Sequence, residues 1–369
     1  MKSFIQNLFP FAIVLLLCNC SNDYTEIPDN ETELQKAKAT LGEKLFFEKG
    51  MSNPTGMACA NCHSPETGFS DPLHSITSPG INPALFGSRN SPSLAYTVFA
   101  PEQYYNGVDE TYIGGLFYDG RAQTLEAQAV QPLLSAHEMN NSSVQMVANK
   151  IRNLSYYADF AKLYGASSND SDLINQFSNA ISFFEKSTKM NSFTSKFDYF
   201  NKQLIAFSED EKKGLLLFKG KANCASCHVL EPDEKVGKIL FTDFSYDNIG
   251  VPKNPNNPFY AMPTSLNPEG ANYVDFGIGK IVNQTNHDGK FKVPTLRNVA
   301  VSAPYFHNGF YSTLAEVIHF YNKRNVENLG TPEVNQNVNT TELGNLLLSP
   351  QEELQLEKFL LTLTDHYQR

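Results

Sequence analysis

Two stretches decide the fold of this chain: Cys59-Ala60-Asn61-Cys62-His63 and Cys224-Ala225-Ser226-Cys227-His228. Both have the C-x-x-C-H pattern by which c-type haem is attached to protein. Two thiols at this spacing reach the two vinyl groups of one haem, and the adjacent histidine turns a ring nitrogen onto the iron. The two copies therefore predict two covalently bound haem c groups, with His63 and His228 as iron ligands.

Two other chemistries also use paired cysteines. A redox or disulfide C-x-x-C does not require a histidine at the next position in both copies. A structural zinc site built from both pairs would leave the two histidines over as extra ligands. The chain has six cysteines in 369 residues, which is too few for a disulfide scaffold.

The remaining two cysteines lie near the N-terminus. The apolar run from Leu8 to Cys18 is too short to span a bilayer as a helix, which takes about 20 residues, but it suits the apolar part of a secretory signal. A cysteine directly after such a run resembles a bacterial lipoprotein signal. Residues 1–20 are therefore expected to be a signal segment, with a lipid anchor at Cys20 or, alternatively, at Cys18. An ordinary cleaved signal is the other interpretation, and both place the mature protein in the periplasm or cell envelope.

The composition suits a folded protein that does not bind nucleic acid. Hydrophobic residues make up 41% of the chain and charged residues 18%, which argues against a disordered chain. The net charge of −10 cannot neutralise phosphates, and it favours small basic partners. The length allows two or three domains.

Helical patterns surround both motifs. Apolar residues recur at helical spacing in residues 33–47, before the first motif, and again in residues 173–184. Ser208 is a good N-cap for a helix before the second motif, and Ser349, followed by proline, begins a helix near the C-terminus. A mainly α fold is predicted, with the two halves joined by a linker in residues 188–207.

Several further stretches resemble the bacterial dihaem cytochrome c peroxidase family. They are residues 41–47 (LGEKLFF), 89–94 (RNSPSL), 117–122 (FYDGRA), 291–298 (FKVPTLRN) and 303–309 (APYFHNG). The resemblance covers nearly all of the mature chain and implies two cytochrome c-like haem domains with a calcium ion between them. Residues 21–190 would hold the peroxidatic haem and residues 191–369 the electron-transfer haem.

The resemblance also implies the residues that act on peroxide. A peroxide bound to iron needs a group that moves a proton between its two oxygens before their bond breaks. Glu138 matches the family's general acid/base and Gln128 its hydrogen-bonding aid, although on their own both residues are typical of a polar surface. Tyr118 lies where the family usually has tryptophan between the haems. It could carry a hole there only by losing its phenol proton, and it is otherwise an ordinary core residue.

Metal ligands are implied in the same way. Calcium would be bound by the side chain of Asn90, by Ser302, where the family has threonine, and by the carbonyl of Pro304, all of them hard oxygen donors. His74 is the candidate for a labile sixth ligand of the first haem. It lies closer in sequence to His63 than the family's ligand does, and the alternative is a loop histidine bonded to solvent.

The sixth ligand of the second haem departs from the usual peroxidase pattern. The family's methionine lies fourteen residues after the equivalent of His307, and this position is Tyr321 here. We predict ligation by His228 and Tyr321, as in the tryptophan-oxidising, methylamine-utilisation type of dihaem protein. The alternatives are Met262, His319, or water with Tyr321 as a core residue. A phenolate favours ferric over ferrous iron, whereas methionine raises the potential.

The resemblance implies a periplasmic, lipid-anchored dihaem peroxidase. Peroxide reduction takes two electrons and two protons, and a small cytochrome c or copper protein would supply electrons one at a time. The alternatives are a dihaem oxidase that modifies protein tryptophans and a non-enzymatic dihaem electron carrier, which would not need Gln128 or Glu138. A homodimer is common in the family.

Overall fold

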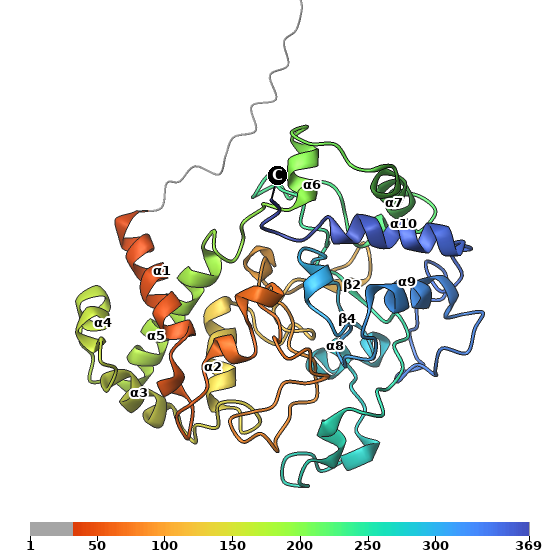
Figure 1. The fold of residues 1–369 in the computed structure, drawn as a ribbon. Coiled ribbons are helices and arrows are strands. Elements are labelled where there is room, and N and C mark those ends of the chain that lie inside the picture. Colours follow the sequence, from red (N-terminus) through yellow and green to blue (C-terminus); the bar gives the residue numbers. More distant parts are fainter. Residues whose placement is uncertain (1–31, 369) are drawn as a thin grey trace, which may run out of the picture. The chain divides into compact units, whose positions relative to one another are not determined.

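The computed structural model describes residues 32–368, which form a mainly helical fold, as predicted (Figure 1). The helices are α1 (Glu33–Phe46), α2 (Leu125–Leu134), α3 (Val144–Arg152), α4 (Tyr157–Tyr164), α5 (Asp170–Lys186), α6 (Lys196–Asn201), α7 (Glu209–Lys219), α8 (Ile278–Val282), α9 (Leu314–Lys323) and α10 (Pro350–Leu361). Two antiparallel pairs of short strands are β1 (Tyr104–Asn106) with β2 (Thr111–Ile113), and β3 (Tyr246–Asp247) with β4 (Phe291–Lys292).

The first hydrophobic core is built around α5, which packs against α1, α2 and α3. Gly42 on α1 allows the close approach of α5, because a Cβ atom at this position would lie 1.9 Å from the carbonyl oxygen of Ala180. The core also includes Phe193 and two residues from much later in the chain, Leu240 and Phe244. The amphipathic pattern of residues 173–184 is therefore the central helix of this core.

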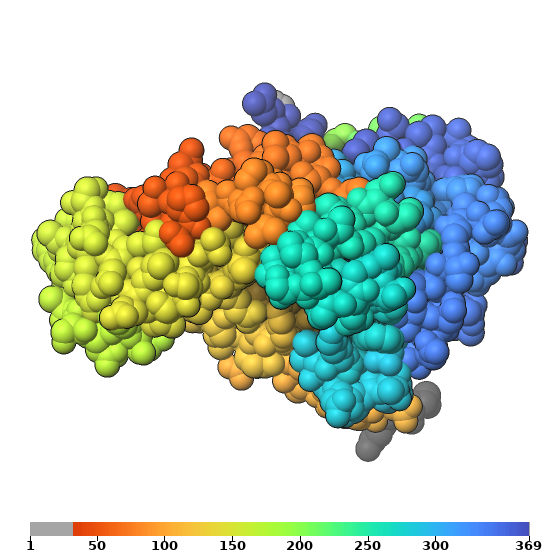
Figure 2. All heavy atoms as spheres, turned by 90° about the horizontal axis from the view of Figure 1, so that it is seen from below, coloured from red at the N-terminus to blue at the C-terminus, as the bar shows by residue number. Residues whose placement is uncertain are grey.

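The second hydrophobic core is built around α10, which packs against α7 and α9. Gly214 on α7 has the same role as Gly42, because a Cβ atom there would lie 2.0 Å from the carbonyl oxygen of Gln355. Ser208 and Ser349 cap α7 and α10 through capping boxes, as the sequence predicts. Figure 2 shows α3 to α5 (yellow-green) and α9 and α10 (blue) on opposite sides, with the teal segment around residues 255–275 between them.

The expected linker, residues 188–207, contains α6 and a buried ion pair. Asp198 on α6 accepts hydrogen bonds at 2.9 and 3.1 Å from Arg297, whose side chain is 1% exposed. The Arg297 guanidinium also lies against the rings of Tyr96 and Phe193 from the first core. This segment is thus structured, and the ion pair connects it to both cores.

The remaining chain consists of turns and single-turn 3-10 helices. These are η1 (Lys49–Met51), η2 (Cys59–Asn61), η3 (Pro65–Thr67), η4 (Thr97–Phe99), η5 (Cys224–Ser226), η6 (Pro258–Ala261), η7 (Gly270–Asn272), η8 (Thr285–His287) and η9 (Val299–Val301). The predicted signal segment, residues 1–20, lies outside the described residues. Within residues 32–368, no helix combines the length and apolar character needed to cross a membrane.

Candidate haem-binding site

The first motif folds as a tight turn at the edge of the first core. The turn η2 brings the backbone N–H of His63 within 3.0 Å of the carbonyl oxygen of Cys59. His63 Nδ1 lies 3.2 Å from the carbonyl oxygen of Phe69, and because a carbonyl only accepts, Nδ1 carries the proton. Nε2 is then left with a lone pair for iron, which is the arrangement that a histidine ligand requires.

The second motif repeats this geometry. In η5 the N–H of His228 donates to the carbonyl of Cys224 at 2.9 Å, and Nδ1 lies 2.9 Å from the carbonyl oxygen of Phe241. Burial lowers the pKa of both motif histidines, which keeps the imidazoles neutral, as metal binding requires. The residues of both motifs therefore fit a covalently attached haem.

The four motif cysteines do not suit the two other chemistries. None of the four forms a disulfide in the described structure, and burial raises the pKa of Cys59, Cys62 and Cys224 to about 12, far from that of a reactive thiolate. Cys59 packs against the first core and Cys224 against the second, so the pairs do not form one shared zinc site. Within residues 32–368, no group of three or more His, Cys, Asp or Glu is arranged to hold a metal ion.

A large, mostly apolar cavity begins at the second motif. Its walls include Cys224, Cys227 and His228, and it extends to Tyr118 and Gln128 from the first half of the chain. A haem attached at the second motif would be held in this cavity. The cavity therefore connects the second motif to residues that the sequence assigns to the first haem site.

Tyr321, on α9, lines the same cavity as His228. Burial raises the pKa of its hydroxyl, and so do the charges of Cys227 and Cys224, which means that the phenol is near the haem-attaching thiols. The structure thus brings the predicted ligand pair, His228 and Tyr321, to one cavity. Ligation itself remains a prediction.

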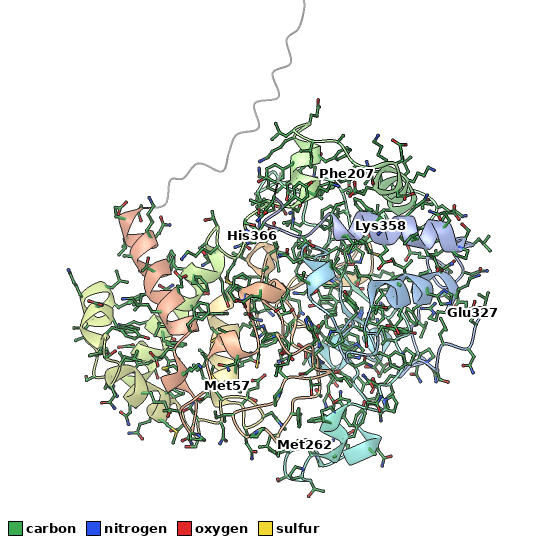
Figure 3. The ribbon with its side chains drawn as sticks, viewed as in Figure 1. Met57, Phe207, Met262, Glu327, Lys358 and His366 are labelled. Carbon is green, nitrogen blue, oxygen red and sulfur yellow. The ribbon has the colours of Figure 1, made fainter. Side chains whose placement is uncertain are left out.

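The two rival ligands have other partners. His319 lies two residues from Tyr321 on α9, but its Nδ1 is 3.2 Å from Glu353 and its Nε2 is 3.1 Å from Glu327. The sulfur of Met262 accepts a hydrogen bond from the backbone N–H of Phe86 at 3.3 Å. Figure 3 shows Met262 on the segment around η6, and it does not belong to the described lining of the cavity.

The predicted acid, Glu138, lies close to the first motif. Its charge raises the pKa of both Cys59 and Cys62, so its carboxyl group is within electrostatic range of the haem-attaching thiols. Glu138 keeps an exposed face, yet the protein that surrounds it raises its own pKa, while Ser135 and the charge of Arg121 oppose this rise. A carboxyl group of this kind holds its proton more readily than a fully solvated one.

Gln128 is buried on α2, and its side-chain oxygen has no hydrogen-bond partner among the described residues. It lines the cavity that begins at the second motif, whereas Glu138 is not part of that lining. The structure therefore places both residues near haem-binding features without showing a contact between them.

Arg121 is a residue that the sequence reasoning did not single out. Its guanidinium lies 3.6 Å from the ring centre of Phe117 and 3.0 Å from the Asp119 carboxylate, and its charge acts on Glu138. The sequence does contain a signal for Arg121, because this residue belongs to the FYDGRA stretch that resembles the family.

Tyr118 lies close to several charged residues that the sequence analysis did not connect with it. Burial raises the pKa of its phenol, and the cation of Arg89 opposes that rise. Arg89 itself is held by Asp119 at 2.7 Å and by Asp275 at 2.6 Å. Lys292 is half-buried nearby, and the loss of solvent around its ammonium group lowers its pKa to about 8. No short sequence pattern links these residues, because they come from distant parts of the chain.

The candidate calcium ligands and His74 come from neighbouring loops. Asn90, Ser302 and Pro304 all line the large cavity, and the Asn90 side chain donates to the carbonyl of Ser75 at 3.1 Å. His74 is exposed, and its Nδ1 lies 2.8 Å from the carbonyl oxygen of Ala303. Calcium binding and iron ligation by His74 stay predictions.

The two attachment motifs, each on its own hydrophobic core, define a c-type haem protein with two haem sites. Comparison with known proteins agrees. The family model for di-haem cytochrome c peroxidase matches residues 36–204. The methylamine utilization protein MauG of Paracoccus denitrificans (strain Pd 1222) is 33% identical over 351 residues, which cover 89% of both chains.

Two further proteins support the same assignment. Cytochrome-c peroxidase IdrP2 of Pseudomonas sp. (strain SCT) is 30% identical over 344 residues, covering 89% of this chain and 81% of the relative. The crystal structure of the diheme peroxidase BthA from Burkholderia thailandensis E264 has a TM-score of 0.74 at 30% identity, covering 89% of this chain and 86% of BthA. The chain therefore belongs to the dihaem cytochrome c peroxidase and MauG family, which implies two haem c groups.

Proposed function

We propose that this protein is a dihaem peroxidase that reduces hydrogen peroxide to water with electrons from a small cytochrome c or copper protein. The observation that carries the proposal is the position of Glu138, an acid whose charge acts on both thiols of the first motif. Its raised pKa suits a group that holds and moves a proton. Several relatives named as cytochrome c peroxidases support the same activity.

In this proposal the residues of the first site manage protons. The haem at His63, when bound, supplies the electrons for peroxide reduction. Glu138 takes the proton from the near oxygen of peroxide and delivers it to the far oxygen, which leaves as water. Gln128 orients the substrate through its side-chain amide. The positive charge of Arg121 limits the rise in the pKa of Glu138.

The second site passes electrons inward. We propose that Tyr321 and His228 would both hold the haem iron of the second motif, because both line one cavity and the thiols of the motif act on the phenol. Tyr118 lines the same cavity, and in this proposal it would relay charge between the haems. Calcium bound by Asn90, Ser302 and Pro304 would fix the loops around this relay.

A second candidate function is the oxidation of tryptophan residues in another protein. Two observations favour it: Tyr321 lines the same cavity as His228, and relatives named MauG, a methylamine utilization protein, match most of this chain. A phenolate ligand disfavours the ferrous state, which suits high oxidation states better than electron storage. A pure electron carrier would not need Glu138 near the first motif.

The cellular setting is proposed from the sequence. Export and a lipid anchor at Cys20, or Cys18, would place the protein in the periplasm or cell envelope, where c-type haem is attached. The net charge of −10 favours a basic electron donor. A homodimer is compatible with the family.

Steady-state consumption of peroxide with reduced cytochrome c tests the function. We expect turnover in the purified dihaem protein and its loss in Glu138→Gln. A protein that holds two haems but consumes no peroxide would exclude the peroxidase. Slow peroxide turnover combined with oxidation of an added tryptophan-containing protein would favour the second candidate.

A further inference from the structure

A buried glutamate on α5 has no role in the function proposed above. Glu185 is 4% exposed, and one of its carboxyl oxygens has no hydrogen-bond partner among the described residues. It follows Phe184 and lies one turn after Ile181, both of them residues of the first core. Burial of a carboxyl group without a full set of partners costs free energy, so packing alone does not explain a glutamate at this position.

The second core shows what the fold itself requires at the equivalent position. A Cβ atom on Gly42 would meet the carbonyl of Ala180 and the Cβ of Phe184; one on Gly214 would meet the carbonyl of Gln355 and the Cβ of Phe359. Both helix pairs thus use the same spacing of four residues.

By this correspondence, the residue after Phe184 matches the residue after Phe359, which is Leu360. Leu360 is buried and lines the cavity of the second motif. The fold therefore accepts an apolar residue here. The same correspondence turns Glu185 toward the first motif.

Electrostatics agree with this position. After burial, the charge of Glu185 is the largest contribution that raises the pKa of Cys59, the thiol that attaches the haem without being an iron ligand. Burial raises the pKa of Glu185 itself to about 8, and the charge of Glu126 adds to the rise while Lys186 opposes it. A carboxyl with such a pKa can gain or lose a proton near neutral pH.

Glu126, on α2, connects this position to solvent. Its side chain is 34% exposed, accepts a hydrogen bond at 2.5 Å from the buried hydroxyl of Ser182, and lies 3.7 Å from Lys186. Ser182 is one turn before Lys186 and three residues before Glu185 on α5. A short polar path thus leads from the surface into the apolar core.

Other charged groups that pack against α5 have partners elsewhere. From α1, Lys38 contacts Asn179 at 3.3 Å, and Glu43 binds Lys189. From α3, Lys150 donates to the backbone carbonyls of Gly50 and Ser52, and Arg152 pairs with Asp170. Glu126 and Lys186 are therefore the charges that act on Glu185.

We propose that Glu185 is a redox-linked proton site of the first haem, loaded from solvent past Glu126 and Ser182. When one electron from a donor protein or a mediator dye reduces the iron, the Glu185 carboxylate takes up one proton from solvent. When the iron loses the electron, the carboxylic acid releases that proton. The proposal rests on the proposed binding of a haem at the first motif.

The sign of the effect follows from charge. A carboxylate stabilises the more positive, oxidised iron, so reduction becomes less favourable as pH rises through the pKa of Glu185. Below that pKa the acid is neutral and the equilibrium does not change with pH. Between the pKa of Glu185 in the oxidised protein and its higher pKa in the reduced protein, the reduction constant falls by up to about tenfold per pH unit, the limit for one proton per electron.

An equilibrium redox titration of the intact dihaem protein, with mediator dyes and without peroxide, tests this between about pH 6 and pH 10. In the wild type, we expect the reduction constant of the first haem to fall with rising pH and that of the second haem to stay constant. The optical spectrum of each haem reports its reduction. Glu185→Gln and Glu185→Leu, which copies Leu360, should be flat over the same range. In Glu126→Gln, the pH at which the reduction constant begins to fall should be lower, because the variant lacks a charge that raises the pKa of Glu185. The fall itself should remain.

Two results would overturn the proposal: a flat profile in the wild type, or an unchanged slope in Glu185→Leu. Glu43→Gln, which changes an acid on α1 that pairs with Lys189, is the matched control and should behave as wild type. Because the titration contains no peroxide, it separates this proposal from the proposed function. A dihaem protein that consumes no peroxide, but whose first haem still shows the pH-dependent reduction constant, would contradict the proposed peroxidase function and not the role of Glu185.

Discussion

The two haem-motif regions are built alike and surrounded differently. In each, a 3-10 turn carries the cysteines, the histidine bonds a backbone carbonyl through Nδ1, and a glycine lets two helices cross closely. The charges of Glu138 and Glu185 act on the thiols of the first region, whereas those of Asp243, Asp247 and Glu342 act on Cys227 in the second. Tyr321 and Leu360 line the cavity of the second region. The features for attachment thus lie in the shared turn, and the different roles proposed for the two sites would come from residues outside it.

Removing one attachment site at a time should have the largest effect. Cys59→Ser with Cys62→Ser should leave one haem and abolish peroxide turnover, because the proton-handling Glu138 serves the first site. Cys224→Ser with Cys227→Ser should also leave one haem but retain a reaction of peroxide with the first haem in a single turnover. Haem content by mass spectrometry and stopped-flow spectra provide the measurements. Equal single-turnover rates in both double variants would mean that the two sites are not divided as proposed.

Glu138→Gln is expected to lower turnover by about 10²–10⁴-fold, the usual contribution of a general acid/base. The amide keeps the size of the side chain but cannot give or take the proton. The optical spectrum of the second haem should not change, since Glu138 acts on the thiols of the first motif. Glu48→Gln, a change in an acid bonded to Tyr156 in the first half, is the control for a nonspecific loss of charge. Full turnover in Glu138→Gln would remove Glu138 from the mechanism.

Gly42→Ala and Gly214→Ala test the correspondence of the two helix pairs. Each new methyl group would meet a backbone carbonyl oxygen at about 2 Å, so the helices must separate, at a cost of about 2–3 kcal/mol in the free energy of unfolding. Thermal unfolding followed by circular dichroism measures both. Gly87→Ala, where the added carbon meets nothing within 4 Å, should stay near wild type. Destabilisation of only one helix pair would break the correspondence.

Tyr321→Phe should have the smallest effect on activity and a specific effect on spectra. Without its phenol oxygen the second haem should lose its sixth protein ligand, which changes its ferric spectrum and raises its potential. Tyr311→Phe is the control, because Tyr311 contacts Phe306 as Tyr321 does but does not line the cavity in the described structure. An unchanged ferric spectrum and potential in Tyr321→Phe would show that another group holds the position.

The sequence predicted those elements whose signals are local. Capping residues such as Ser208 and Ser349 and the apolar spacing of residues 33–47 located α7, α10 and α1 closely, since each signal acts within one or two turns. The haem-attachment residues follow from spacing alone. The sequence predicts a linker in residues 188–207, whereas in the structure Ser195 and Asp198 form the capping box that begins α6 there.

The missed residues depend on contacts between distant parts of the chain. Glu185 lies at the edge of an apolar stripe, where a single polar residue resembles the solvent-facing side of a helix. It is buried in the folded chain, in which α1, α2 and α3 pack against α5. Arg89 is placed by Asp119 and Asp275, from three separate segments. The positions of Glu138, Gln128 and Tyr321 were proposed from family resemblance, because nothing in their local sequence distinguishes them.

Arg297 has a consequence for how charge moves through the molecule. Its guanidinium binds Asp198 and the carbonyl of Ile239 at 2.8 Å, and it lies against rings of the first core. A hinge motion between the two cores would separate Arg297 from its partners. It would leave a buried charge unpaired, which is strongly unfavourable, so such motion should be small. In the proposed function, the distance between the two haems would therefore be fixed when the chain folds. The speed of transfer should then respond to driving force and temperature, and hardly at all to solvent viscosity.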